Sequence, residues 1–177
     1  MTKQKNIIIT GFIGTGKTTV GQDIARIMER EFYDVDMLIE QQAGASIAEL
    51  FRTRGESHFR DCETQALLSL SRKHTCVIAT GGGTLLTPDN MDLAGVSGVI
   101  FCLEADPAVL ERRLRYSHSR PLVNQDDLGA SLRRLLAKRR GAYQRLPHHV
   151  DTFGYTPAEV AAHIIDLYLS ITRRERT

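Results

Sequence analysis

The chain has 177 residues, 42% of them hydrophobic and 25% charged, which fits one globular domain with a sizeable core over residues 1–177. Its formal net charge of +2 is too mild to predict nucleic-acid binding, although a local basic cluster could still bind an anion. No apolar run suits a membrane span, and the three cysteines show neither a zinc-site nor a disulfide-framework spacing. We therefore expect a cytoplasmic protein without a membrane or nucleic-acid partner.

Short apolar runs alternate with longer helical patterns along the chain, which is typical of an α/β fold with a parallel sheet. Three runs are apolar throughout, as strands buried on both faces are, at 6–10, 77–80 and 98–104. Two shorter segments, 32–36 and 148–152, are candidates for flanking strands. Helical patterns occupy 16–30, 46–73 with breaks, 106–115, 127–145 and 157–171.

The stretch GFIGTGKTTVG, residues 11–21, lies between the first expected strand and the first expected helix. The spacing Gly11-x4-Gly16-Lys17-Thr18 matches the phosphate-binding P-loop, whereas the glycine spacing of a dinucleotide-binding turn fits worse. In a P-loop, backbone N–H groups surround the phosphates, the lysine reaches the terminal phosphates and the threonine can bind magnesium. The motif predicts a site for ATP and Mg²⁺ at Gly14, Thr15, Gly16, Lys17, Thr18 and Thr19.

Asp34 and Asp36 stand two residues apart near the end of the second expected strand. They share one face if this segment stays extended. Taken alone, such a pair is more often a helix cap or a turn. Beside a P-loop, one carboxylate could hold magnesium through water while the other accepts a proton from an attacking hydroxyl group.

Three glycines, Gly81, Gly82 and Gly83, follow the strand expected at 77–80. They could form a tight turn, or they could let the backbone approach a ligand closely. Two helical segments supply cations, which are usually solvated but which in a cleft would suit a carboxylate. These cations are Arg54, Arg60, Lys138, Arg139 and Arg140.

The stretch ERRLRYSHSRPL carries five basic or histidine side chains and no acid between Arg112 and Pro121. Read alone, it could be an RNA-binding patch. We favour a lid that closes over ATP, because phosphoryl transfer uses a cation that stabilises the transferring group. The residues concerned are Arg112, Arg113, Arg115, His118 and Arg120.

Taken together, these motifs resemble the shikimate kinase family, from about Ile8 to the last helix. The segments that carry the resemblance are GFIGTGKTTVG, FYDVDMLIE, SIAELFRTRGESHFRDCE, VIATGGG, RPL and LAKRRGAY. The resemblance implies a nucleoside monophosphate kinase fold with a five-stranded parallel sheet, a substrate-binding segment at about 36–62 and a lid at about 113–125. It also implies transfer of the γ-phosphoryl group of ATP to the 3-hydroxyl of shikimate, with Mg²⁺, in aromatic amino acid biosynthesis. We expect a monomer.

The resemblance also assigns roles to individual residues. It implies catalytic roles for Lys17, Asp36 and Arg120, and magnesium contacts for Thr18 and Asp34. The implied shikimate contacts are Asp36, Arg60, Gly81, Gly82, Gly83 and Arg139, and the nucleotide contacts beyond the P-loop are Arg113 and Arg120. Where relatives can carry a basic residue near adenine, this chain has DTFGYTP, so Tyr155 could stack on the base.

Two other classes of function remain open from the sequence. Another small-molecule kinase of this fold, such as a gluconate or nucleotide kinase, would keep the P-loop but need not keep both arginines with TGGG. A nucleotide switch or RNA-binding regulator would keep the P-loop without an acceptor pocket, which the paired aspartates argue against. His148 and His149 match no role in the family, and we expect one structural partner for each rather than a metal site.

Overall fold

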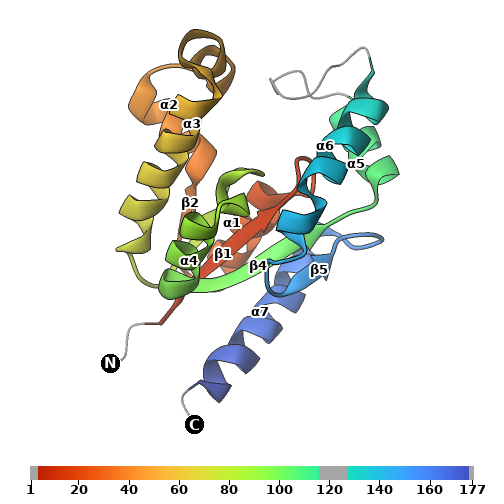
Figure 1. Ribbon diagram of the computed structural model, residues 1–177. Coiled ribbons are helices and arrows are strands. Elements are labelled where there is room, and N and C mark those ends of the chain that lie inside the picture. The colour runs from red at the N-terminus through yellow and green to blue at the C-terminus, as the bar shows by residue number, and fades with distance from the viewer. Residues whose placement is uncertain (1–3, 116–126, 176–177) are drawn as a thin grey trace.

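The computed structural model describes residues 4–115 and 127–175 of the chain (Figure 1). Its centre is one five-stranded sheet in the order β2-β3-β1-β4-β5, with every neighbouring pair parallel. The strands are β1 (Asn6–Gly11), β2 (Glu31–Asp34), β3 (Cys76–Ala79), β4 (Gly98–Glu104) and β5 (His149–Asp151). The α/β fold class and all five strand positions are thus confirmed, but β2 ends two residues earlier than the sequence pattern predicted.

Helices connect the strands and cover the sheet. They are α1 (Lys17–Ile27), α2 (Val35–Ala43), α3 (Ile47–Ser71), α4 (Pro88–Ser97), α5 (Pro107–Leu114), α6 (Leu128–Tyr143), α7 (Pro157–Arg174) and the short 3-10 helix η1 (Thr84–Leu86). The break expected within 46–73 is a kink at Gly55, whose φ is 80°. The sequence pattern predicted neither α2 nor α4. No described helix is both long and apolar enough to cross a membrane.

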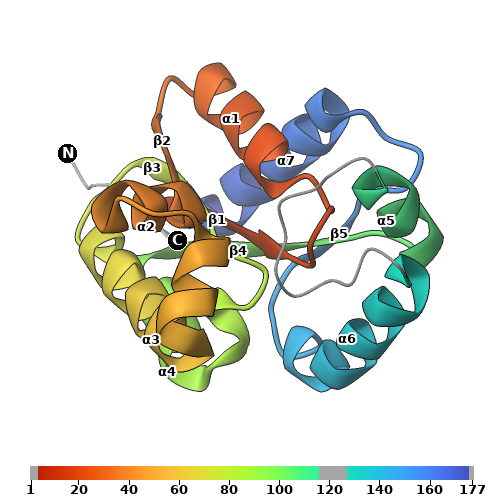
Figure 2. The same cartoon turned by 90° about the horizontal axis from the view of Figure 1, so that it is seen from above.

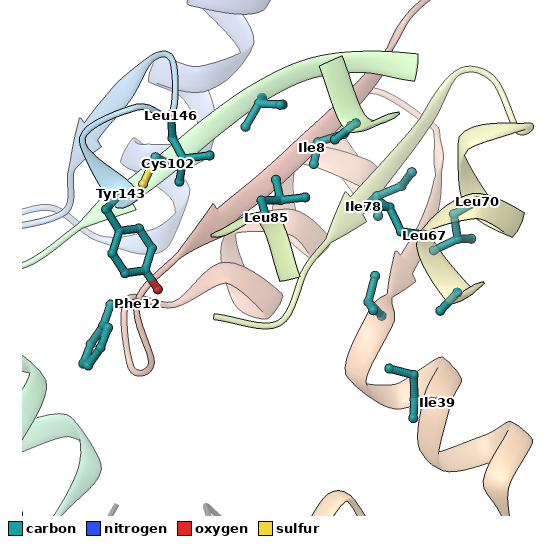
Figure 3. Close-up of a cluster of buried hydrophobic side chains, with 14 of the residues drawn as sticks. Ile8, Phe12, Ile39, Leu67, Leu70, Ile78, Leu85, Cys102, Tyr143 and Leu146 are labelled. Carbon is teal, nitrogen blue, oxygen red and sulfur yellow. The ribbon is translucent and has the colours of Figure 1, made fainter. Parts of the chain in front are cut away.

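The two faces of the sheet are covered by different helices, as Figure 2 shows from above. Alternate side chains of a strand point to opposite faces. Ile7 and Ile9 of β1 therefore pack with α1 and α7, while Ile8 joins the cluster formed with α2, α3, α4 and α6. Figure 3 shows this second cluster, in which Ile8 lies near Ile78 of the neighbouring strand β3.

Because all strands are parallel, their carboxyl ends lie at one edge of the sheet. Ligands of open α/β sheets bind beyond this edge, where the strand order reverses. The P-loop follows β1 here, Asp34 ends β2, and the glycines at 81–83 follow β3. The topology thus gathers the motifs found in the sequence at one end of the molecule.

Candidate active site

The loop between β1 and α1 has the backbone of a phosphate-binding loop. Gly14 and Gly16 have φ values of 83° and 95°, which glycine adopts without strain. A methyl group on Gly11 would lie 2.3 Å from the carbonyl oxygen of Leu103, so no larger residue fits there. No side chain caps the N-terminus of α1, whose partial positive charge therefore faces the site.

Lys17 and Thr15 both contact the main chain of this loop. Lys17 Nζ donates a hydrogen bond to Phe12 O at 3.1 Å, and Thr15 Oγ1 donates to the same oxygen at 2.8 Å. The ammonium group of Lys17 is therefore held alongside the phosphate loop. Thr15 is only 2% exposed and its N–H also donates to Phe12 O, at 3.3 Å, so this residue does not line the cleft.

The geometry of the paired aspartates corrects one expectation. The segment does not stay extended, because the chain turns into α2 at Val35 and Asp34 becomes its N-cap. Asp34 Oδ1 accepts hydrogen bonds from Asp36 N at 3.0 Å and Met37 N at 3.3 Å, while Asp34 Oδ2 accepts one from Thr18 Oγ1 at 2.7 Å. Asp34 is therefore both a helix cap and a partner of the P-loop.

Asp36 lies in the first turn of α2 and reaches a different neighbour. A methyl group on Gly81 would lie only 2.7 Å from Asp36 Oδ1. The carboxylate of Asp36 is thus packed against the glycine segment, and that of Asp34 against the P-loop. This separation supports different roles for the two aspartates.

Backbone conformation does not explain the three glycines that follow β3. None of Gly81, Gly82 and Gly83 has a positive φ. A methyl group on Gly81 would also lie 2.7 Å from Glu63 Oε1, and one on Gly83 would lie 2.5 Å from Arg60 Nη1. Close approach of these side chains therefore explains Gly81 and Gly83, whereas a methyl group at Gly82 would meet no neighbour closer than 3.4 Å.

Arg60 is held by two carboxylates of its own helix, α3. Its Nη1 donates to Glu63 Oε2 at 2.5 Å, and its Nη2 donates to Glu56 Oε1 at 2.8 Å. Glu63 is only 1% exposed, and its other oxygen accepts a hydrogen bond of 2.5 Å from Thr84 Oγ1. These contacts fix the direction of the guanidinium group while one side of it faces the cleft.

Burial and ion pairing shift the pKa values of Glu63 and Arg60 in opposite directions. Burial raises the pKa of Glu63, against the opposing effects of the Arg60 charge and the Thr84 hydrogen bond. Burial alone would lower the pKa of Arg60, but the carboxylates of Glu63 and Glu56 raise it. Arg60 therefore stays a cation. Sequence reasoning missed Glu63 and Thr84, although the i, i+3 spacing of Arg60 and Glu63 could have indicated the first.

Arg139 reaches the same region from α6. Its Nη1 lies 3.5 Å from Gly82 O, and the hydroxyl group of Tyr143, one turn later, donates to this same oxygen. The sequence did not indicate a role for Tyr143, because its contact with Gly82 joins elements far apart in the chain.

One cleft of about 700 Å³ joins most of the predicted site residues. Its walls contain Gly14, Gly16, Lys17, Thr18, Thr19, Asp34, Asp36, Arg60, Gly81, Gly82, Gly83, Arg113 and Arg139. Phe51 and Phe59, which the sequence did not single out, add an apolar wall with ring centroids 4.8 Å apart. The structure therefore places the P-loop and both arginines of the expected acceptor site around a single space.

Other predicted residues lie at or beyond its edge. Arg113 Nη1 donates to Gly14 O at 3.3 Å and lies 3.5 Å from Thr152 Oγ1. Tyr155 is 59% exposed and does not line the cleft. Arg120 and most of the lid expected at 113–125 lie outside the described residues.

The two adjacent histidines have one partner each, as predicted. His149 Nδ1 lies 2.7 Å from Glu104 Oε1, and the ring of His148 lies 5.5 Å from that of Phe101. Of the three cysteines, Cys76 and Cys102 are buried, whereas Cys62 is only partly buried.

The fold and the cleft define the class of this protein as a P-loop kinase. A profile described as shikimate kinase matches residues 13–168. The shikimate kinase of Thermodesulfovibrio yellowstonii is 43% identical over 164 residues, which cover 93% of this chain and 95% of the relative. That of Caldanaerobacter subterraneus is 41% identical, covering 96% and 99%. The chain belongs to the shikimate kinase family.

Solved structures agree with this assignment. A shikimate kinase from Acinetobacter baumannii in complex with shikimate has a TM-score of 0.89 and 33% identity, with 94% of each chain covered. The enzyme from Aquifex aeolicus has a TM-score of 0.79 and 31% identity, covering 93% of this chain and 96% of the other. A gluconokinase from Sinorhizobium meliloti is 19% identical with a TM-score of 0.57, covering 96% and 97%. This last likeness concerns the fold alone.

Proposed function

We propose that this chain transfers the γ-phosphoryl group of ATP to the 3-hydroxyl group of shikimate, giving shikimate 3-phosphate and ADP. The observation that carries the proposal is the single cleft whose walls combine Lys17 of the P-loop with Arg60 and Arg139. A phosphate site beside two guanidinium groups suits ATP together with an acceptor that bears a carboxylate. Membership of the shikimate kinase family supports shikimate as that acceptor.

The acceptor half of the cleft suits a small carboxylated ring. Arg60 and Arg139 come from different helices, and two planar guanidinium groups can bind one carboxylate from two directions. The ring can lie against the apolar wall of Phe51 and Phe59, and its hydroxyl groups can donate to Asp36. Contacts at both ends of the ring would decide which hydroxyl group faces the P-loop.

The donor half supplies charge for the transferring group. The backbone N–H groups of the P-loop and the ammonium group of Lys17 stabilise the negative charge of the phosphates. Asp36 orients the attacking hydroxyl group and accepts its proton. Arg120 adds a cation from the lid, while Arg113 and Tyr155 contact adenine. All these residues belong to one chain, so one copy of the chain holds the whole proposed site, and we propose a monomer in the cytoplasm.

Thr18 and Asp34 fit a magnesium ion bound with the nucleotide. A hydroxyl and a carboxylate oxygen 2.7 Å apart beside the P-loop are ligands of the type that Mg²⁺ prefers. The described residues contain no group of three or more His, Cys, Asp or Glu side chains that could hold a metal alone, so oxygen atoms of nucleotide and water would complete the shell. The ion would neutralise charge on the β- and γ-phosphates.

Asp34→Asn is expected to raise the magnesium concentration needed for half-maximal activity, because an amide is a poorer ligand for a hard cation than a carboxylate. The amide oxygen can still cap α2, so folding should survive. Shikimate KM should change little. Magnesium titration at saturating shikimate measures the effect, and an unchanged magnesium requirement would remove Asp34 from the metal site.

Arg139→Ala is expected to raise shikimate KM by about tenfold to a hundredfold, since a charge-assisted hydrogen bond contributes roughly 1.5 to 3 kcal/mol. ATP KM should change much less. Arg140→Ala is the matched control, because Arg140 follows on the same helix but does not line the cleft. Replacing shikimate by methyl shikimate, which lacks the carboxylate charge, should raise the acceptor KM less in Arg139→Ala than in the wild type. An equal rise of the acceptor KM in both enzymes would show that Arg139 does not contact this carboxylate.

Arg60→Ala should raise shikimate KM by a similar factor, but it should also lower stability. It leaves the buried Glu63 carboxylate without the guanidinium that compensates its charge. Thermal unfolding and shikimate KM should therefore both change in this variant. Arg52→Ala, at an exposed position of the same helix, should change neither.

A further inference from the structure

The backbone of Gly82 lies where three parts of the active site meet. A methyl group on this residue would lie 3.4 Å from Gly11 O, 3.5 Å from Ile13 N and 3.7 Å from the Tyr143 hydroxyl oxygen. The space beside Gly82, about the size of one methyl group, is therefore bounded by the start of the P-loop on one side and by Tyr143 of α6 on the other. Any shift of Gly82 changes the spacing between the acceptor and the phosphate donor.

The hydroxyl group of Tyr143 makes the closest side-chain contact with Gly82 among the described residues. The buried Tyr143 donates its hydrogen to Gly82 O, and its ring packs edge to face on Phe12, with centroids 6.2 Å apart. Figure 3 shows the two rings together near the end of β1. Burial raises the pKa of Tyr143, so the hydroxyl group keeps its proton and remains a donor around neutral pH.

The same carbonyl group lies within reach of Arg139. Arg139 Nη1 is 3.5 Å from Gly82 O, at the limit of a hydrogen bond, whereas the Tyr143 hydroxyl group makes the close contact. Positions 139 and 143 lie one turn apart on the same face of α6. The Gly82 carbonyl oxygen has two lone pairs and accepts from both side chains, with the Tyr143 hydroxyl group making the shorter contact.

We propose that Tyr143 is a positioning residue, which holds Gly82 beside the P-loop and thereby fixes the carbonyl group that orients Arg139 toward the carboxylate of the acceptor. This inference rests on the proposed function, because it takes shikimate as the acceptor. Without the hydroxyl group, Gly82 would lose its shorter hydrogen bond, and the guanidinium group of Arg139 would lose the fixed carbonyl that it contacts.

Packing alone does not replace this hydrogen bond. The ring of Tyr143 and that of Phe12 also line a second cavity of about 700 Å³, between α6 and the carboxyl end of β4. A phenylalanine ring at position 143 would therefore have space on this side into which it can move. The hydroxyl contact is what fixes the ring and the glycine segment relative to each other.

Tyr143→Phe removes one oxygen atom and tests the inference. We expect shikimate KM to rise by about twofold to tenfold, as for the loss of one neutral hydrogen bond, while ATP KM changes less than twofold. Tyr168→Phe is the matched control, since Tyr168 is also buried but donates to Lys5 O, far from the cleft. It should lower the midpoint of thermal unfolding and leave shikimate KM unchanged.

The double variant Tyr143→Phe/Arg139→Ala separates positioning from a general loss of stability. If Tyr143 acts through Arg139, its substitution should raise shikimate KM less in the Arg139→Ala background than in the wild type. Equal rises of shikimate and ATP KM in Tyr143→Phe, fully additive effects in the double variant, or no effect at all would each overturn the inference. Absence of shikimate turnover in the wild type would overturn the proposed function as well.

Discussion

Lys17→Met is expected to leave a folded protein whose turnover falls by at least a hundredfold to a thousandfold, the range found for loss of one donor to transition-state charge. Methionine has a similar length and is also a good helix former, so it suits the first position of α1. It cannot offset charge on the γ-phosphate. Release of ADP at saturating substrates measures turnover, and thermal unfolding measures stability.

The control for this variant is Lys73→Met, which changes an exposed lysine just beyond α3. Its turnover should match that of the wild type. Near-normal turnover in Lys17→Met would show that residues 11–18 are not the phosphate site. The whole assignment of the donor half of the cleft would then fail.

Asp36→Asn is expected to reduce turnover by about a hundredfold, because general base catalysis by a positioned side chain contributes roughly a hundredfold to ten-thousandfold. The asparagine keeps the shape of the side chain next to Gly81 but loses the charge that orients the acceptor hydroxyl group. Phosphoryl transfer is often loose, so positioning can account for part of this loss.

The magnesium requirement separates Asp36→Asn from Asp34→Asn. Asp36→Asn should leave it unchanged, whereas Asp34→Asn should raise it and leave shikimate binding largely intact. Asp61→Asn, at an exposed position of α3, controls for the loss of a carboxylate as such. Matching defects of the two variants in both titrations would refute the division of roles.

The parts of the site that the sequence predicted well depend on short stretches of chain. The P-loop is a local backbone structure set by Gly11, Gly14 and Gly16, so its motif can be read without knowledge of the fold. The three central strands could also be found, because burial on both faces of a parallel sheet leaves continuous apolar runs. The edge strands β2 and β5 are less buried, and their patterns are weaker.

The parts that the sequence missed depend on contacts between distant segments or on a competition between local structures. Glu63 meets Thr84 across 21 positions and Tyr143 meets Gly82 across 61, and no spacing rule predicts such pairs. The sequence pattern predicted a strand as far as Asp36. The capping hydrogen bonds of Asp34 start α2 at Val35 instead. The adenine contact of Tyr155 and the lid role of Arg120 stay predictions.

The most direct test of the account is one ADP-release assay in which shikimate, quinate, gluconate and nucleoside monophosphates are offered separately as acceptors with ATP and Mg²⁺. Gluconate also carries a carboxylate, so this comparison separates shikimate kinase from another sugar-acid kinase of the same fold. If the proposed function is correct, kcat/KM is highest for shikimate and the product is phosphorylated at the 3-hydroxyl group. A clear preference for any other acceptor, or ADP release that does not depend on shikimate, would contradict it.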